Sequence, residues 1–391
     1  MNKKTLPEQF KRNTAVTLIV CLFVLLWLPT LDYFFGLDHS QQPTENRALA
    51  HFPTLTASLD SVHDFPAGLE NYFRDHFGFR NRLIRWERRW KHDWFRESAA
   101  PDVIIGRDGW LFFAGQHMIE HFEGLKLWTD AELNDWQKLL EKRRDWLAQR
   151  GIKYIFVLCP DKHSVYPELL PPWLAGLGRS NKVNQLIAHM KAHSTVEMLD
   201  LRPVLLEAKK NAITYQYSDT HWNSYGGFVA YQSLVSALQR QLPGLTAPLP
   251  LTAFDQRPSQ KPGGDLTKIL AQPNPPMETN DTVFALRSAG PKLTVADVTE
   301  RFPKKWRRLT EPKATLFDGA TGKAVMFRDS FAGTWYAFLG YNFHEVLYVW
   351  QYEWDAAFLE REKPQVVIDE TLERFFNIAE PAKLLQQDAL P

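Results

Sequence analysis

Apolar residues recur along most of this chain in short continuous runs separated by stretches of helical spacing. Nearly every residue of the run at 152–158 is apolar, and the helix that begins near Thr129 or Asp130 places its leucines and Trp136 on one face. Continuous apolar strands that alternate with helices are typical of a parallel sheet covered on both faces. The pattern therefore predicts an α/β fold with a three-layer parallel sheet. Predicted strands lie at 103–105, 110–113, 152–158, 196–199, 324–327, 345–349 and 366–368, and further predicted helices at 181–193 and 226–241.

The segment 243–312 interrupts this alternation. It is rich in proline, contains Gly263-Gly264 and has weak periodicity. Such a stretch is typical of a long connection. We expect it to be an excursion, with short strands of its own, from a single α/β domain at 101–391.

The segment 15–37 predicts a transmembrane anchor. It is apolar apart from Asp32 near its far end, and a helix of this length spans the roughly 30 Å hydrocarbon layer of a bilayer. Four basic residues precede it, which predicts a cytoplasmic tail at 1–14 and the rest of the chain outside. A cleaved signal peptide is the alternative, although no small-x-small cleavage site follows. In a bacterium the anchor would lie in the inner membrane and the domain in the periplasm.

Residues 38–100 predict a polar connector followed by a largely helical segment at 64–95. Basic and aromatic residues are interleaved in that helical segment, which is compatible with contact to anionic lipid headgroups. Acidic residues accompany them, so a solvated helix face is the alternative and the one we favour.

The charge, aromatic and cysteine content of the chain argue against some classes of function. Lys+Arg 46 against Asp+Glu 45 give a net charge of +1, which provides no electrostatic basis for nucleic-acid binding. The 26 Phe, 14 Trp and 12 Tyr residues suit a core, and aromatic faces also stack on sugar rings. Cys21 lies in the apolar segment and Cys159 in a predicted buried strand, so they are not expected to pair, and no C-x-x-C metal spacing occurs.

Asp219 and His221 form the first candidate for catalytic chemistry, just before the helix at 226–241. A carboxylate two residues from a histidine can orient the imidazole, fix its tautomer and raise its basicity when the backbone is extended. The alternative is a helix-capping Asp beside a core His, because such pairs also arise by chance.

Ser330 is the second candidate. The apolar strand at 324–327 runs into Asp329-Ser330 and then into an aromatic helical pattern. A strand–turn–helix of this kind exposes a serine nucleophile, whose own N–H and the helix dipole stabilise an oxyanion. A plain N-cap is the alternative. No G-x-S-x-G motif occurs, which disfavours an ordinary α/β-hydrolase.

Both segments are predicted at the carboxyl edge of the sheet, and together they resemble a known family. Asp219-Thr220-His221-Trp222 and Arg328-Asp329-Ser330-Phe331 are similar to motifs of the SGNH-hydrolase-like alginate acetyltransferases AlgJ and AlgX and the related DHHW proteins. The nucleophile motif departs from the Gly-Thr-Ser-Tyr of the alginate enzymes. Further similar segments are 45–47, 52–53, 72–80, 106–112, 160–168, 264–266 and 367–375.

This resemblance implies an SGNH-like fold and O-acetylation of an exported polysaccharide such as alginate. Ser330 would be the nucleophile that carries the acetyl group, His221 the general base and Asp219 its orienting partner. A multi-pass membrane-bound O-acyltransferase would supply the acetyl group. The alternatives are a polysaccharide acetylesterase and a noncatalytic assembly or binding subunit of an exopolysaccharide machine.

Other residues have two interpretations each. Trp222 would stack on a sugar or fill the core, and Arg328 would hold an acidic sugar carboxylate or pair with an acid of the fold. Asp161-Lys162 would point into the site or form a structural salt bridge. Histidine pairs at i,i+4 lack an H-E-x-x-H signature, so we predict no metal site, and no cofactor is expected. Those pairs are His117 with His121 and His189 with His193.

Overall fold

The computed structural model describes most of the chain, which divides into two compact units. One unit comprises Met1–Ala100 with Lys268–Pro273, and the other comprises Pro101–Thr267 with Asn274–Pro391. The predicted tail up to residue 7 and the connector at 38–49 lie outside the described residues. The described residues are 8–37, 50–55, 59–80, 82–83, 86, 100–174, 180–272, 274–287, 290–306, 312–388 and 390.

Two helices make up most of the described part of the first unit, α1 (Glu8–Phe35) and α2 (Leu59–His76). α1 includes most of the apolar segment 15–37, for which we predicted a transmembrane anchor. Among the residues that the structure describes, no helix is both long and apolar enough to cross a membrane. α2 begins earlier than the helix predicted at 64–95, and much of that segment beyond residue 83 lies outside the described residues.

A seven-stranded sheet forms the centre of the second unit, with strand order β4-β3-β11-β9-β10-β8-β7. The strands from β4 to β10 in this order are parallel to one another, which confirms a mostly parallel α/β sheet. The bounds are β3 Lys153–Cys159, β4 Met198–Asp200, β7 Thr294–Asp297, β8 Lys313–Leu316, β9 Lys323–Phe327, β10 Glu345–Val349 and β11 Val366–Leu372.

Both faces of this sheet are buried under apolar side chains. Successive residues of a strand point to opposite faces, so each central strand contributes to both. In β3, Ile155 and Val157 pack into one apolar cluster, whereas Phe156 and Leu158 pack into the other. The first cluster lies under α9 and the second under α5 and α7. The result is the three-layer arrangement that the continuous apolar strands predict.

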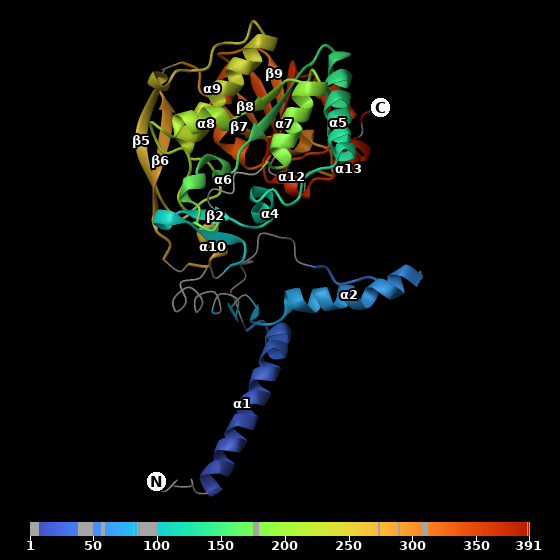
Figure 1. The fold of residues 1–391 in the computed structure, drawn as a ribbon, viewed down its shortest axis with the longest axis vertical. Coiled ribbons are helices and arrows are strands. Elements are labelled where there is room, and N and C mark those ends of the chain that lie inside the picture. The colour runs from blue at the N-terminus through green and yellow to red at the C-terminus, as the bar shows by residue number, and fades with distance from the viewer. Residues whose placement is uncertain are drawn as a thin grey trace. The chain divides into compact units, whose positions relative to one another are not determined.

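Helices and short 3₁₀ turns connect the strands (Figure 1). The cap of α5 explains its start: the Thr129 side chain accepts from the Glu132 N–H and Glu132 bonds back to the Thr129 N–H. The α-helices of this unit are α4 Met118–Phe122, α5 Asp130–Ala148, α6 Lys162–Val165, α7 Lys182–His193, α8 Arg202–Ala208, α9 Ser224–Gln241, α11 Ala356–Glu362, α12 Phe375–Ile378 and α13 Pro381–Gln387. A further short helix, α10 Asp265–Ile269, begins in this unit, and its residues from Lys268 onward are assigned to the first unit. The 3₁₀ helices are η2 Arg107–Gly109, η3 Pro167–Leu169, η4 Leu251–Ala253, η5 Thr299–Arg301, η6 Phe331–Ala337 and η7 Leu339–Asn342.

The far edge of the sheet differs from the wholly parallel prediction. β8 pairs antiparallel with β10, and β7 pairs antiparallel with β8. β7 lies inside the segment 243–312, which is therefore not only an excursion. The residues of β7 are exposed apart from the half-buried Ala296, as suits a short edge strand, and they lack the continuous apolar run that marks the central strands.

The same segment also forms a separate hairpin, β5 (Phe254–Pro262) with β6 (Met277–Leu286). It stands at the margin of the unit beside α8 and α9 (Figure 1). Phe254 and Phe284 at its base pack on Phe228 of α9, which anchors the hairpin to the domain. A second small sheet pairs β1 (Val103–Ile105) with β2 (Leu111–Phe113).

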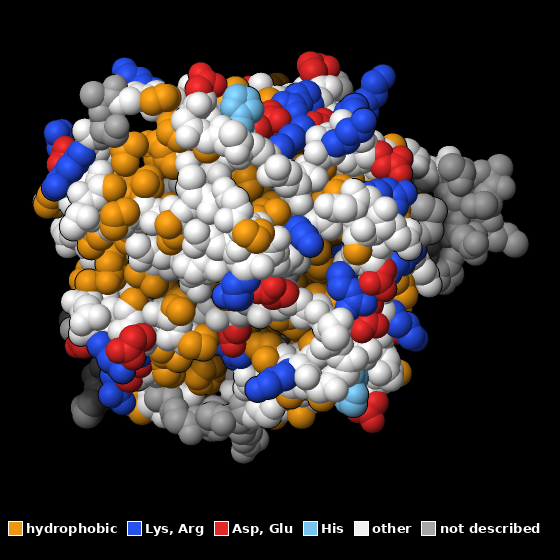
Figure 2. Space-filling model, turned by 90° about the horizontal axis from the view of Figure 1, so that it is seen from above, with side chains coloured by type: hydrophobic (Ala, Val, Ile, Leu, Met, Phe, Trp, Pro, Cys, Tyr) orange, Lys and Arg blue, Asp and Glu red, His pale blue; other side chains and the backbone are white. Residues whose placement is uncertain are grey.

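Charged side chains of both signs are interspersed on the face that Figure 2 shows. No broad patch of a single sign gathers there, consistent with the net charge of +1. Cys21 and Cys159 are both free thiols.

Candidate active site

Ser330 lies in the turn that follows β9, at the carboxyl edge of the parallel strands. The turn is held by buried side chains: the Asp329 N–H donates to Glu370 Oε2 (2.7 Å), and the Phe331 N–H donates to Asp329 Oδ1 (2.9 Å). The helix after Ser330 is the seven-residue 3₁₀ helix η6, not the α-helix that the aromatic pattern predicts. The Ser330 side chain makes no capping hydrogen bond, which leaves its hydroxyl free to face the site.

Asp219 and His221 lie in the loop before α9, which an isolated bridge between Tyr215 and Trp222 closes. The loop is bent rather than extended, because Asp219 Oδ1 accepts from the backbone N–H of His221 (3.1 Å) as well as from its ring. The cap of α9 is Asn223, whose side chain accepts from the Gly226 N–H. Asp219 is therefore not a helix cap.

The three predicted residues meet in one hydrogen-bonded chain. His221 Nδ1 lies 2.6 Å from Asp219 Oδ1, and His221 Nε2 lies 2.7 Å from Ser330 Oγ. Because an ionised carboxylate only accepts, the proton of a neutral imidazole is on Nδ1. Nε2 then presents its lone pair to the serine hydroxyl, which is the arrangement that a general base and a nucleophile need.

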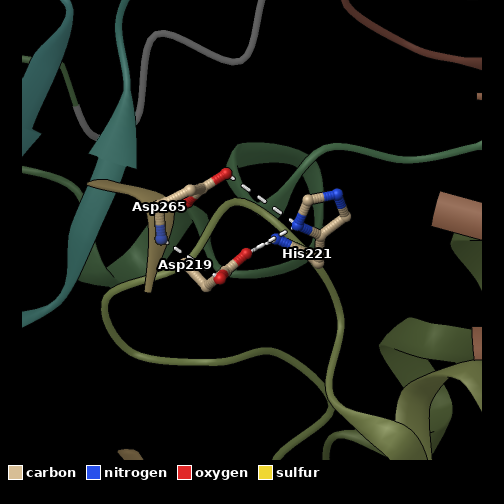
Figure 3. Close-up of side chains that lie close together, drawn as sticks. All are labelled: Asp219, His221 and Asp265. Carbon is tan, nitrogen blue, oxygen red and sulfur yellow. Dashed lines mark hydrogen bonds and ion pairs between the residues drawn. The ribbon is translucent and has the colours of Figure 1, made fainter. Parts of the chain in front are cut away.

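A second carboxylate, that of Asp265, stands beside the same ring nitrogen (Figure 3). Asp265 Oδ2 is 3.9 Å from His221 Nδ1, and the Asp265 N–H donates to Asp219 Oδ2 (3.2 Å). Its own oxygens accept from the N–H and the hydroxyl of Thr220 (2.7 and 2.6 Å). From the sequence, Gly264-Asp265-Leu266 was predicted only to resemble a segment of the family, with no role for Asp265 beside His221. The Gly-Asp pair before a short helix is the sequence feature that could have indicated this position.

The surroundings of Asp219 favour its charged form. Burial by itself raises the pKa of Asp219, but hydrogen bonds and charge from His221, together with the backbone N–H groups of His221 and Asp265, lower it well below its ordinary value. A permanently ionised Asp219 holds the imidazole in one tautomer. The His221 side chain is 26% exposed, so the ring remains accessible from solvent.

Residues 103–348 match the SGNH hydrolase-like domain, acetyltransferase AlgX. The chain belongs to this AlgX family. Its structural neighbours and curated relatives carry AlgJ, AlgX, PatB1 and DHHW names, in agreement with the resemblance of the two motifs.

The AlgX-family assignment is accompanied by similarity to curated relatives. A probable alginate O-acetylase AlgJ of Pseudomonas putida is 30% identical over 146 residues, which are 37% of this chain and 36% of the relative. The AlgJ of Pseudomonas syringae pv. tomato is 28% identical over 177 residues, or 44% of this chain and 42% of the relative. The alignments thus span well under half the length of these relatives.

Two solved structures have similar folds. A DHHW family protein from Eubacterium siraeum has a TM-score of 0.50 at 14% identity, covering 74% of this chain and 100% of its own. The O-acetyltransferase domain of Pseudomonas putida AlgJ has a TM-score of 0.46 at 19% identity, covering 73% of this chain and 98% of its own.

Trp222 has the core position that is one of its two interpretations, and its edge also lines a groove beside η6. Its side chain is 1% exposed, and it packs on Phe331 and Trp335 with ring centroids 5.0 and 5.5 Å away. Its Nε1 donates to Thr334 Oγ1 (3.2 Å). In this AlgX-family domain Trp222 is thus a core residue that joins the His221 loop to η6.

Arg328 is 4% exposed and lies beneath the nucleophile turn. Its guanidinium donates to the Asp329 carbonyl (3.0 Å) and the Tyr336 hydroxyl, and it lies 4.5 Å from the ring centroid of Trp350. Within the described part of the chain it makes no ion pair with an acid. Its Nε is buried without a partner there. Arg328 therefore braces the turn and lacks the acidic partner that one interpretation predicts, whereas the sugar-carboxylate interpretation stays a prediction.

Asp161 and Lys162 support the site from the end of β3. Asp161 pairs with Arg374 (2.7 Å), as the salt-bridge interpretation predicts. Lys162 donates to the carbonyls of Leu111 and Tyr217 (2.8 and 3.2 Å). Burial lowers the pKa of Lys162 to about 7, although the charges of Asp219, Asp265 and Glu278 act in the opposite direction.

Asp219, His221 and Asp265 are also spaced as metal ligands, with one atom of each within 4.8 Å of the others. Both ring nitrogens of His221 are already engaged, Nδ1 by Asp219 and Nε2 by Ser330. A metal at this set would need the Nδ1 lone pair and would break the bond to Asp219. The donor set therefore suits proton transfer better than metal binding.

Proposed function

We propose that this chain is an O-acetyltransferase that transfers acetyl groups to hydroxyls of an exported polysaccharide through an acetyl-Ser330 intermediate. The observation that carries the proposal is the continuous chain of hydrogen bonds from Asp219 through His221 to Ser330 Oγ, at 2.6 and 2.7 Å. Membership of an acetyltransferase family supports the reaction class. The names of the relatives support a polysaccharide as acceptor.

In the first half-reaction, Ser330 Oγ attacks the carbonyl carbon of the acetyl donor while His221 Nε2 takes the hydroxyl proton. The negative charge that develops on the carbonyl oxygen needs an N–H donor. We assign the Ser330 backbone N–H, because the neighbouring N–H groups of Asp329 and Phe331 are committed to carboxylates. The protonated His221 returns its proton to the leaving group, and acetyl-Ser330 remains.

In the second half-reaction, a sugar hydroxyl attacks acetyl-Ser330. His221 Nε2 removes the proton of that hydroxyl, a tetrahedral intermediate forms, and its collapse releases Ser330 Oγ, which recovers the proton from His221. Asp219 acts through the ring by fixing the tautomer and stabilising the imidazolium that forms in each half.

The place of the reaction is part of the same proposal. An apolar segment at 15–37 after four basic residues favours attachment to the bacterial inner membrane with the catalytic unit in the periplasm. Acetyl-CoA is a cytosolic metabolite, so a multi-pass membrane-bound O-acyltransferase would carry acetyl groups across. Fusion after residue 100 of a reporter that is active only in the periplasm tests this orientation. An inactive fusion, together with an active fusion of a cytoplasmic reporter at the same position, would contradict it.

The decisive experiment is mass spectrometry of the full chain after incubation with a chromogenic aryl acetate. Wild-type protein should gain one acetyl group on Ser330, and Ser330→Ala should lose the adduct and reduce turnover by about 10³-fold or more. A Ser236→Ala variant, at an exposed position of α9 outside the groove, is the matched control and should retain the adduct. Acetyl on another residue, or turnover by Ser330→Ala within about tenfold of wild type, would refute the assignment. Release of acetate despite saturating acceptor would favour the esterase.

A further inference from the structure

A groove of about 430 Å³ opens between η6 and the β5–β6 hairpin. Gly333 and Thr334 of η6 line one side, and Ser259 and Thr282 of the hairpin line the other. A 3₁₀ helix rises about 2 Å per residue, so the groove begins roughly 6 Å along the chain axis from Ser330. Its volume falls in the range of sites that bind small molecules or single sugar residues.

Gln216 supplies an unpartnered polar group at this groove. Its side chain is 6% exposed, it lines the groove, and its Oε1 has no hydrogen-bond partner among the described residues. A buried amide oxygen without a donor is unfavourable, so this position suits a ligand that brings a hydrogen-bond donor. The Gln216 backbone N–H donates to the carbonyl of His221 (3.2 Å), which ties this group to the reactive loop.

The charges of the groove cancel. Lys261 and Asp281 are its charged lining residues among those described, and their Nζ and Oδ2 atoms are 3.9 Å apart. Asp281 is fixed in place by the N–H groups of Ser224 and Thr282, at 2.8 Å each. Arg328, the predicted partner of an acidic sugar, is buried and does not line the groove. No uncompensated cation is therefore present there for a sugar carboxylate.

The rest of the lining combines hydroxyl groups with apolar surface. Ser224, Ser259 and Thr282 provide hydroxyls, whereas Val283 and Phe284 of β6 provide apolar contacts. A sugar ring has the complementary character, with hydroxyl groups at its edge and C–H groups on its faces. A uronate would have to leave its carboxylate unpaired or compete with Asp281 for Lys261, which costs binding free energy.

We propose that this groove is the acceptor subsite and that it selects an uncharged, hydroxyl-rich sugar residue of the polysaccharide over a uronic acid residue. The proposal rests on the proposed acetyl transfer at Ser330. A sugar held in the groove places the adjoining residue of the polymer at the nucleophile, and Gln216 Oε1 accepts a hydrogen bond from one of its hydroxyls. The transfer itself is the second half-reaction written above, with no further reactant.

The experiment presents the full chain with an aryl acetate as donor and two sets of acceptors. One set contains neutral hexasaccharides of glucose, galactose and mannose, and the other contains hexamers of mannuronate and guluronate. We expect kcat/KM for acetyl transfer to the best neutral hexamer to exceed that for either uronate by about 100-fold or more, the scale of a missing charge partner at a binding site. Acetyl-Ser330 formation without any acceptor is measured in parallel.

Two variants test the groove itself. Gln216→Leu should raise KM for the neutral hexamer by about tenfold, the effect of one hydrogen bond to a ligand, whereas Gln256→Leu, exposed on the same hairpin and outside the groove, should not. Thr282→Lys adds a cation and should improve kcat/KM for the uronate hexamers. This gain keeps the test informative if Gln216→Leu folds poorly.

The outcomes separate the two proposals. If acetyl-Ser330 does not form in wild type, the proposed function fails. If acetyl-Ser330 forms but the uronates are preferred, no hexamer is acetylated, or Thr282→Lys leaves the preference unchanged, the acceptor subsite fails and the acetyltransferase assignment stands. Preference for neutral hexamers that weakens in both groove variants supports the subsite.

Discussion

Gly264 lies directly against Asp219. A Cβ added at Gly264 would stand 2.3 Å from Asp219 Cβ and 2.5 Å from its Cα, closer than real Cβ atoms come to neighbouring atoms. The contact is with backbone and the first side-chain carbon, so a rotamer change does not relieve it. This approach lets the Asp265 N–H reach Asp219 Oδ2, and the loop at 264–265 thereby holds the carboxylate that orients His221.

Gly264→Ala should therefore displace Asp219 while leaving the sheet intact. We expect kcat for acetyl transfer to fall by about 10²-fold, because misplacing a catalytic group by about 1 Å has an effect of that size. Steady-state kinetics with an aryl acetate, alongside circular dichroism, measure it. Gly244→Ala is the matched control, since a Cβ there meets nothing within 4 Å. Equal activity of the two variants would contradict the role of the close contact.

The two carboxylates beside His221 should differ in importance. Asp219 Oδ1 is 2.6 Å from the ring nitrogen, whereas Asp265 Oδ2 is 3.9 Å away and is bonded to Thr220. Asp219→Asn should lower kcat by about 10³–10⁴-fold, and Asp265→Asn by about tenfold, because Asp265 acts on the ring only through charge and loop position. The kcat values of the two variants and of their combination measure this order. A larger loss in Asp265→Asn would assign the orienting role to Asp265.

Much of the central fold could be predicted from the sequence, because a strand buried on both faces is marked by a continuous apolar run. The predicted strand at 345–349 has the same bounds as β10, and β3 differs by one residue at each end from the prediction at 152–158. β7 was missed because an edge strand is solvated and has no such run. The 3₁₀ form of η6 was missed because the hydrogen-bond register of a short helix depends on tertiary packing.

The side chains of the candidate site could be predicted from the sequence, whereas the residues that hold them in place could not. Asp219, His221 and Ser330 belong to local patterns whose chemistry requires those residue types. Glu278 and Glu370 bond to Ser218 and Asp329 across long sequence separations, and no local pattern marks such contacts. Trp222 and Arg328 show that a residue beside these groups in sequence can be almost wholly buried, which no local pattern revealed.

Asp329 should act as a positioning residue for Ser330. One of its oxygens accepts from the Phe331 N–H (2.9 Å), and the other accepts from the Leu372 N–H (2.9 Å) and the Tyr352 hydroxyl (3.1 Å). Asp329→Asn places an NH₂ group opposite one of these donors and should lower kcat by about 10²-fold with little change in KM for the donor. Tyr352→Phe removes one bond and leaves both backbone contacts, so it should cost less than tenfold. A rise in KM alone would point to substrate binding by Asp329.

Lys162 should make stability depend on pH. The side chain is 2% exposed, and burial lowers its pKa to about 7 from an ordinary 10.5 despite the opposing charges of Asp219, Asp265 and Glu278. Between these two values the unfolded chain binds more protons at this position than the folded chain does. The free energy of unfolding therefore rises with pH across this window, by at most about 1.4 kcal/mol per pH unit from this group, and the contribution is lost as pH falls toward 7.

Urea unfolding of wild type and Lys162→Met from pH 7 to 10 measures this contribution as a difference between the two curves. Lys162→Met removes the ammonium group that donates to the Leu111 and Tyr217 carbonyls, so the variant is expected to be less stable at every pH. The informative quantity is the slope of the difference between the two curves. Wild type should gain stability relative to the variant as pH rises. Lys138→Met removes an exposed lysine of α5 and corrects for the general effect of net charge. Parallel curves for wild type and Lys162→Met, after that correction, would mean that Lys162 keeps its proton in the folded protein and that the cation is held by the surrounding carboxylates.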